Sequence, residues 1–213
     1  MSLAAALARL PLFPLPGVTI FPGQIVPLHV FEPRYRQMTR DALATHRALA
    51  LACVLPGAVD AQGHPPIPRI VGAGTIVEHE ALPDGRFHLL LRGEARVELV
   101  ELPFTPPYRV ARARIAVDPG PPVPDHELAA LSAVARAIAR IVKKRAPEID
   151  LALPAAAPPD RLADLLAARM VPDAEARQAL IEQPSAAQRT ATLLGMLSAQ
   201  LQHLQGVEGG VAN

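Results

Sequence analysis

Residues that could support hydrolysis or nucleotide chemistry are few in this chain. Its two lysines are Lys143 and Lys144, and neither follows a glycine-rich loop, so the Gly-x-x-x-x-Gly-Lys-Ser/Thr phosphate-binding motif is missing. A Ser-Lys dyad needs a serine within hydrogen-bond reach of a lysine. Ser132 shares a predicted helix with Lys143 but lies about 16 Å from it along the helix axis, and the other three serines could meet a lysine only through tertiary folding. We therefore expect a protein that is not an enzyme.

The seven histidines are scattered along the sequence and do not indicate a metal site. His79 and His88 are candidate diagonal neighbours on a predicted hairpin, but zinc would need a third and a fourth ligand, and we expect Glu78 on the wrong face. His29 lies in an apolar strand, where a core-edge or surface position is favoured over a role in ligand binding. The single Cys53 excludes an intrachain disulfide and a cysteine-rich zinc site. We predict no metal and no cofactor.

Four basic residues recur at helical spacing and form a basic stripe, Arg136, Arg140, Lys143 and Lys144. A solvated helix face is the simpler interpretation. The alternative is a contact with an acidic protein segment or with nucleic acid, which would make the chain an RNA- or DNA-binding regulator. The net charge of +1 and the lack of aromatic residues beside the stripe argue against nucleic acid.

Residues 10–38 contain six prolines and four of the seven aromatic residues, yet the segment is apolar enough for a core. Because proline lacks a backbone donor, this composition predicts short edge strands and tight bends around a small barrel. Pro33 suits the first position of a helix that runs to about Thr45. We expect Glu32 to cap this helix and Arg34 to form a salt link or a surface contact.

Alternating apolar residues predict a hairpin of strands 72–82 and 86–93, joined through Pro83-Asp84-Gly85. Its predicted apolar face comprises Ile76, Leu82, Phe87, Leu89 and Leu91. Its predicted opposite face comprises Val77, His79, His88 and Arg92. Further strands are expected at 27–31, 49–55, 94–101 and 108–117. The first part of the chain should therefore form a half-buried antiparallel sheet.

The composition changes after residue 108, because every aromatic residue precedes this point and Ala, Leu, Arg and Gln dominate beyond it. The proline-rich segment 118–124 predicts a stiff linker. Predicted helices follow at 125–145, 161–170, 174–183 and 185 to about 204, capped by Asp125, Asp160, Asp173 and Ser185. The expected organisation is a β domain at 9–118, a helical subdomain at 124–206 and a disordered tail at 207–213.

The motifs Pro11–Leu15, Phe21-Pro22-Gly23 and Pro27–Tyr35 resemble the opening of the Lon protease N-terminal domain, also called the substrate-binding domain. Segments 72–76, 82–85 and 91–96 follow the order of that family, and the resemblance extends from about Leu10 to Leu204. It implies an α+β fold, with an N-terminal six-stranded PUA-like β pseudo-barrel that includes one helix, followed by a C-terminal α-helical bundle.

The resemblance implies a non-catalytic protein that binds unfolded or tagged polypeptides in protein quality control, although family-based labels would call it Lon peptidase-like. Residues expected near an apolar binding surface, with burial in the core as the competing interpretation, are Phe13, Leu15, Phe21, Phe31 and Tyr35. A separate protease is a candidate partner, and nucleic acid is not expected. Without a membrane-length apolar run or a convincing export signal, we predict a cytoplasmic protein.

Overall fold

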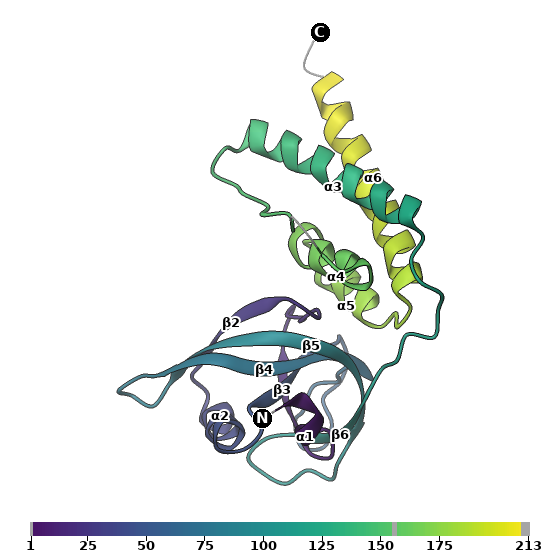
Figure 1. The fold of residues 1–213 in the computed structure, drawn as a ribbon. Helices are drawn as coiled ribbons and strands as arrows, with labels where there is room; N and C mark the ends of the chain where they lie inside the picture. Colours follow the sequence, from purple (N-terminus) through teal and green to yellow (C-terminus); the bar gives the residue numbers. More distant parts are fainter. Residues whose placement is uncertain (1, 155–156, 210–213) are drawn as a thin grey trace. The chain divides into compact units, whose positions relative to one another are not determined.

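Two compact units, Met1–Val117 and Asp118–Asn213, make up the computed structural model, which describes residues 2–154 and 157–209. We call them the β unit and the helical unit. Among the described residues, the β unit contains one six-stranded sheet and two helices, and the helical unit contains four helices (Figure 1). The predicted α+β class is therefore confirmed at this level.

The elements of the β unit agree with most of the predicted strands, and one short helix at the start was not predicted. The predicted strands 86–93 and 94–101 form one long strand, because a bulge at Gly93 and Glu94 lets the chain continue through the irregularity. In chain order the elements are α1 (Leu3–Ala6), β1 (Leu10–Leu15), β2 (Ile25–Val30), α2 (Pro33–Ala44), β3 (Ala48–Cys53), β4 (Ile70–Ala81), β5 (Phe87–Glu101) and β6 (Val110–Ile115).

The sheet has the strand order β2-β5-β4-β3-β1-β6, and an additional pairing of β5 with β6 closes five strands into a ring. The long strand β5 allows this closure, because its first half pairs with β2 and its second half pairs with β6. Strand β2 is the end of the order and stands outside the ring. The β2–β5–β4 part of the sheet therefore extends beyond the barrel (Figure 1).

Strand β1 corrects the expectation that the proline-rich segment forms only edge strands, because β1 lies between β3 and β6. It pairs with β6 at Leu10 and Pro11, and with β3 from Leu12 onward. The amide of Leu12 donates to the Arg109 carbonyl at 2.9 Å. The nitrogen of Pro14, two residues later, faces the same side as the Leu12 amide. At this point β1 extends beyond the start of β6, so no residue of β6 lacks a hydrogen-bond donor because of the proline.

Both faces of the barrel wall are buried. In strand β3 alanine and leucine alternate, so the leucines lie on one buried face and the alanines on the other. Leu49 and Leu51 join a cluster with Phe13, Tyr35 and Met38 on the side covered by α2. The alternate positions face the barrel interior, which α1 closes at one end. This interior is lined chiefly by small residues, Ala48, Ala50, Ala52, Ala73, Ala111 and Ala113, together with Leu10, Leu12, Val71, Val97 and Leu99. Small side chains fit there because the ring has only five strands.

Two glycines allow the turn after β1 to lie directly on the sheet. A Cβ at Gly72 would be 1.8 Å from the Ile20 carbonyl oxygen, and a Cβ at Gly93 would be 2.1 Å from the Phe21 carbonyl oxygen. The Gly93 amide also donates to the Gln24 carbonyl at 2.8 Å. These close contacts fix the turn and bury Ile20 and Phe21 completely.

Helix α2 begins with Pro33 in its first turn, as predicted, but Glu32 does not cap it through its side chain. The Glu32 carboxylate instead pairs with Arg34 at 2.8 Å, and both side chains are exposed. The predicted salt link is confirmed, and Glu32 holds the predicted cap position without a capping hydrogen bond from its side chain. The backbone carbonyl of Glu32 accepts instead from the amides of Tyr35 and Arg36 at 3.0 and 2.9 Å.

The helical unit contains α3 (Asp125–Arg145), α4 (Pro159–Met170), α5 (Ala174–Ile181) and α6 (Ala186–Gly209). The side chain of Asp173 caps α5 by accepting from the Ala176 amide at 2.7 Å. Asp125 and Asp160 are not caps, because prolines take the cap positions and place each aspartate inside the first turn. Helix α6 extends into the predicted 207–213 tail as far as Gly209, and residues 210–213 lie outside the described part.

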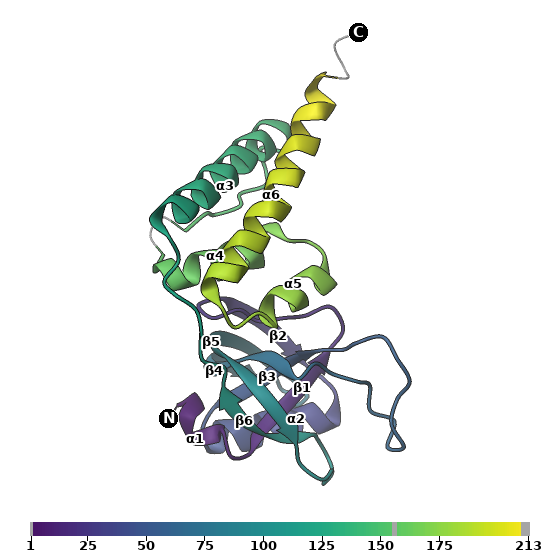
Figure 2. The ribbon, with the colours of Figure 1, turned by 90° about the vertical axis from the view of Figure 1, so that its right-hand side faces the viewer.

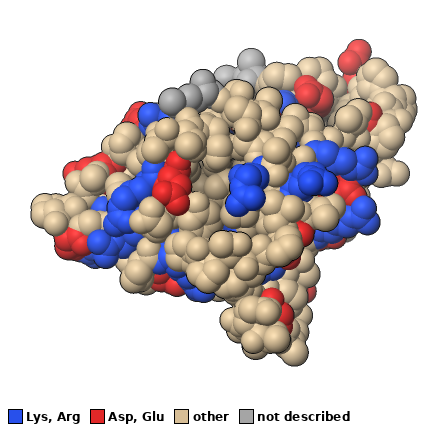
Figure 3. All heavy atoms as spheres, turned by 90° about the horizontal axis from the view of Figure 1, so that it is seen from below, with Lys and Arg blue, Asp and Glu red and all other residues tan. Residues whose placement is uncertain are grey.

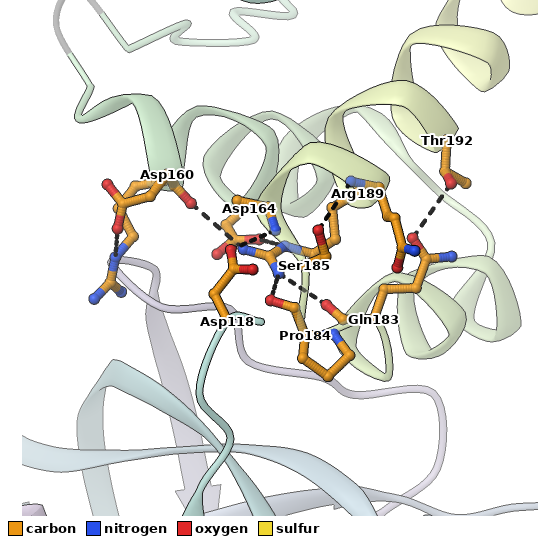
Figure 4. A network of polar contacts seen from close by, with 11 residues as sticks. Asp118, Asp160, Asp164, Gln183, Pro184, Ser185, Arg189 and Thr192 are labelled. Carbon is orange, nitrogen blue, oxygen red and sulfur yellow. Dashed lines mark hydrogen bonds and ion pairs between the residues drawn. The ribbon is translucent and has the colours of Figure 1, made fainter. Parts of the chain in front are cut away.

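The start of α6 is fixed by two acceptors. Ser185 Oγ accepts from the Gln188 amide at 3.4 Å, as the capping motif predicts. Asp118 adds an acceptor from a distant part of the chain, because its carboxylate accepts from the Ala186 amide at 2.7 Å and from the Gly120 amide at 2.8 Å. The irregular segment 118–124 therefore starts with a firm attachment inside the helical unit (Figure 4).

A buried ion pair joins α4 to α6. Arg189 Nε lies 3.0 Å from Asp164 Oδ1, and the two residues are 4% and 1% exposed. Arg189 also donates to the carbonyls of Gln183 at 2.8 Å and Pro184 at 2.5 Å, so it holds the connection between α5 and α6 (Figure 4). A buried charge is tolerated only with such a complete set of partners.

Candidate functional site

The five residues predicted for a binding surface lie in different environments. Phe13, Phe21 and Tyr35 are buried, Leu15 is half-buried, and Phe31 is 59% exposed. The rings of Phe13 and Tyr35 pack against each other with centroids 4.5 Å apart. Burial in the core therefore holds for Phe13 and Tyr35, which belong to the cluster that α2 covers, and Phe21 is fully buried as well, so these three rings do not lie at the surface. Phe31 stays a candidate for contact with a ligand.

The basic stripe is exposed along α3, as its helical spacing predicts. Lys143 Nζ donates to the Pro147 carbonyl at 2.5 Å, and both lysines lie in the last helical turn, where positive charge complements the helix dipole. On the face of the β unit seen in Figure 3, arginines fall in separate groups with uncharged surface between them. None of these features favours nucleic acid, and the four residues, Arg136, Arg140, Lys143 and Lys144, have a sufficient role as a solvated face.

A groove of about 420 Å³ lies on the part of the sheet that extends beyond the ring. Strand β2 alternates strictly between exposed and buried residues, and its buried side faces the cluster under α2. The groove is on the opposite side, where side chains from three strands form two rows. The first row is Pro27, Leu90 and Glu78, and the second is His29, His88 and Glu80. Residues directly opposite in a sheet share a face, so each row crosses the groove.

The second row is held in place by weak polar contacts. The rings of His29 and His88 have centroids 4.9 Å apart, and His88 Nδ1 lies 3.3 Å from Glu80 Oε2. Arg86 Nη1 lies 3.3 Å from His29 Nε2 and the Arg86 Nε donates to Asp84 at 2.6 Å. The Arg86 amide and guanidinium lower the pKa of Asp84, with the amide hydrogen bond as the largest cause. The turn of the hairpin is thus ordered by its own charges.

Apolar side chains extend the groove along β2. Ile25 and Phe31 are 55% and 59% exposed, and they lie on the same face as Pro27 and His29. The rings of His29 and Phe31 stack with centroids 5.9 Å apart. Exposed apolar residues that adjoin a concave site are a common property of binding surfaces.

Because of a bulge in β4, His79 lies on the opposite face of the hairpin from the one predicted. The register shifts between Ile76 and Glu78, so that Glu78 pairs with Leu90 and His79 pairs with the inward-facing Leu89. His79 consequently lies on the side of α2, where Arg47 Nη2 is 3.2 Å from its Nδ1. His79 and His88 therefore do not share a face, and that prediction is wrong. Glu78, which was expected on the face opposite His88, lies on the same face as His88 and lines the groove. An inserted residue reverses the faces of every residue beyond it.

Helix α2 and the loops beside it are tied to the β unit by polar contacts away from the groove. Tyr108 donates to Asp41 at 2.8 Å, and burial, followed by this contact, raises the pKa of Tyr108 to about 12. Arg109 pairs with Glu101 and donates to the Pro65 carbonyl at 2.8 Å. This last bond attaches the 54–69 connection, which otherwise extends away from the sheet (Figure 2).

The lining of the groove is apolar and acidic. Within residues 2–154 and 157–209, the structure contains no group of three or more His, Cys, Asp or Glu residues that could hold a metal ion. The groove has an apolar floor and a carboxylate rim and is large enough for one or two amino-acid side chains. None of its lining residues is a serine, threonine, cysteine or lysine that could act as a nucleophile.

The family model described as the ATP-dependent protease La (LON) substrate-binding domain matches residues 9–199. The chain belongs to this family. A Lon protease of Roseiflexus castenholzii is 31% identical over 195 residues, which cover 88% of this chain and 24% of that protein. The Escherichia coli Lon protease is 24% identical over 207 residues and is covered to 26%. The chain thus spans about a quarter of the length of these Lon proteases.

Solved structures agree with the assignment to the Lon substrate-binding family. The N-terminal domain of Lon protease from the Mycobacterium avium complex superposes with a TM-score of 0.65 at 20% identity, over 89% of this chain and 98% of that domain. A Lon N-terminal domain protein from Xanthomonas campestris gives a TM-score of 0.62 at 21% identity, over 88% and 97%. The fold is therefore that of isolated Lon N-terminal domains.

Sequence reasoning missed the groove, although one signal was present. Ile25, Pro27, His29 and Phe31 alternate with buried residues, and this pattern indicates an exposed face with unusually apolar character. The contribution of β4 had no such signal, because the bulge decides which residues face the groove. No helix within the described part of the chain has the length and apolar character needed to cross a membrane.

Proposed function

We propose that this chain is a non-catalytic binding module that captures unfolded or tagged polypeptides in protein quality control. The observation that carries the proposal is the exposed apolar groove across β2, β5 and β4 in a member of the Lon substrate-binding family. An unfolded chain exposes apolar side chains that a folded protein buries, so an apolar groove distinguishes the two states. A separate protease that receives the bound polypeptide is part of this proposal.

The description of the β unit as a PUA-like pseudo-barrel, followed by a helical bundle, belongs to the same proposal. The pairing of β5 with β6, which closes the sheet, supports a barrel. The pairing of α3 and α4 with α6 supports a bundle of helices. We likewise propose cytoplasm as the compartment in which the module meets its polypeptides.

The test is binding of the purified protein to a permanently unfolded, fluorescently labelled casein-like chain and to a folded protein of similar size. We expect binding to the unfolded chain and little to the folded protein. Phe31→Ser should weaken binding about tenfold, because it removes an exposed aromatic side chain beside the groove.

Val59→Ser is the matched control for this substitution. Val59 is 58% exposed in the same unit but lies in the 54–69 connection, outside the groove. Its replacement should leave the dissociation constant unchanged. Equal and negligible binding of the unchanged protein to both targets would refute the proposed function.

A further inference from the structure

We propose that the groove prefers polypeptide segments in which a lysine or arginine lies two or three residues from an apolar side chain. This inference rests on the proposed function and specifies the class of segment that the groove selects. Its basis is the arrangement of an apolar floor directly beside two carboxylates. The occupant is an extended polypeptide, and the cationic side chain is what distinguishes it from other apolar segments.

The carboxylates are Glu78 and Glu80, two residues apart on β4. Both lie on the groove face, because they pair with Leu90 and His88 beyond the bulge. Both are exposed. The Glu80 carboxylate has one polar neighbour, the His88 ring nitrogen at 3.3 Å, and the Glu78 carboxylate makes no hydrogen bond or ion pair with any described residue. An exposed carboxylate without a partner beside an apolar floor is available to a cation from outside.

The charges that line the groove have one sign. Its lining residues include two glutamates and three histidines but no lysine or arginine. Arg86, at the hairpin turn, is engaged by Asp84 and His29. A phosphate-rich ligand such as RNA would be repelled by this rim, whereas a cationic side chain would gain two acceptors.

The spacing of the proposed motif follows from the geometry of the sheet. Pro27, Leu90 and Glu78 form one row across three strands. Neighbouring strands lie about 4.8 Å apart, so Pro27 and Glu78 are separated by ~10 Å. An extended chain covers this distance in about three residues. Consider a bound segment whose apolar side chain lies over Pro27 and Leu90. The side chain two or three residues further along that segment then lies beside Glu78 or Glu80.

The experiment uses three labelled peptides of equal length that differ at one position. Each carries a Phe in a Gly/Ser host, followed two residues later by Lys, Gln or Glu. Dissociation constants are measured by fluorescence anisotropy at low ionic strength with the full chain. We expect the Lys peptide to bind about fivefold more tightly than the Gln peptide, and the Glu peptide to bind most weakly. Added salt should reduce the difference.

The double variant Glu78→Gln, Glu80→Gln should bind all three peptides with the affinity that the unchanged protein shows for the Gln peptide. The matched control is Glu148→Gln, Glu175→Gln, which makes the same change of charge at two exposed residues of the helical unit. This control should keep the full preference for Lys. Far-ultraviolet circular dichroism of each variant verifies the fold.

The outcomes separate the two proposals. Equal binding of the three peptides, or a preference for Lys that survives the Glu78/Glu80 double variant, overturns this inference while the proposed function stands. Binding of the unfolded casein-like chain without binding of any peptide has the same meaning. If nothing binds, both proposals fail. Self-association in analytical ultracentrifugation that is lost in the double variant would make a second copy of the chain the occupant, and would also overturn the inference.

Discussion

The β unit and the helical unit reach stability by different means. The β unit contains all seven aromatic residues, and four of them, Phe13, Tyr35, Phe87 and Tyr108, pack with leucines and valines in the cluster under α2. The helical unit has no aromatic residue, and it contains the buried ion pair of Arg189 and Asp164. The formal charges differ as well, with 12 basic and 9 acidic residues up to Val117, and 9 basic and 11 acidic residues after it.

This comparison shows where each unit tolerates change. Apolar packing is spread over many contacts, so the β unit can place an open groove on one face of its sheet without losing its core. The helical unit buries an ion pair with defined partners, and its apolar interior is built from aliphatic side chains without an aromatic ring. Substitutions in each unit test this difference.

Arg189→Met should destabilise the helical unit by about 3–5 kcal/mol, because it removes the guanidinium that pairs with the buried carboxylate of Asp164. Both tyrosines lie in the β unit, so tyrosine fluorescence follows that unit while circular dichroism at 222 nm reports mainly the helices. We expect the 222 nm transition to move to lower urea concentration and the tyrosine transition to stay in place.

Two further variants make this result specific. Replacing both partners in Arg189→Met, Asp164→Leu should restore part of the lost stability, since no unpaired charge remains. Arg169→Gln, at an exposed position of α4, should change the free energy of unfolding by less than about 0.5 kcal/mol. An Arg189→Met protein as stable as the unchanged one would show that the ion pair does not hold the helices.

Gly93→Ala should destabilise the β unit by about 2–3 kcal/mol. The new methyl group would meet the Phe21 carbonyl oxygen at 2.1 Å, and backbone atoms cannot move away without disturbing the turn. The urea transition followed by tyrosine fluorescence should move to lower urea concentration, whereas in Arg189→Met it should stay in place. An unchanged tyrosine midpoint would contradict the close contact between turn and sheet.

Tyr108→Phe should destabilise the β unit by about 1 kcal/mol, because a part-buried hydrogen bond to Asp41 is lost. The pKa of Tyr108 is raised to about 12 by burial and then by Asp41, so the folded state favours the protonated phenol. This contribution is fully present below the unfolded pKa near 10 and is lost as the pH rises towards 12. Phenolate absorbance should show a group that titrates near pH 12 in the unchanged protein and is lost in the variant, whereas the phenol of Tyr35, whose pKa burial also raises, should remain.

Gly195→Ala should have the smallest effect and the opposite sign. Gly195 lies inside α6, is exposed, and an added Cβ would meet no atom within 4 Å. Alanine should therefore stabilise the helical unit by about 0.5–1 kcal/mol, since glycine loses more backbone freedom on folding. A lower midpoint at 222 nm would indicate a contact at this face of α6 in solution.

Local patterns allowed most elements to be predicted, and long-range contacts explain the errors. The Asp84-Gly85 turn and its flanking alternation defined the hairpin, and Asp173 marked the start of α5 correctly. Pro14 was misleading, because a proline is allowed inside a sheet where its nitrogen faces the end of a neighbouring strand. Such an alignment of two strands cannot be read from either strand alone.

The candidate site was less predictable than the fold. Phe13 and Phe31 look equivalent in the sequence, yet one is 3% exposed and the other 59% exposed. Their difference depends on which face α2 covers, and this is a tertiary property. The register shift between Ile76 and Glu78 had no sequence signal that we recognised, and it places Glu78 on the groove face and turns the ring of His79 towards Arg47.

The proline in β2 has a consequence for how the edge of this sheet meets other chains. Along the antiparallel β2–β5 ladder, every second residue of β2 is hydrogen-bonded to β5. The amide of Gly93 donates to the Gln24 carbonyl, so Gln24 belongs to the hydrogen-bonded set. Ile25, Pro27 and His29 therefore direct their backbone groups away from β5. Pro27 has no amide hydrogen to offer there, and an incoming strand would find the row of donors interrupted at its centre. The exposed apolar face therefore lies beside a strand edge that is a poor template for edge-to-edge aggregation.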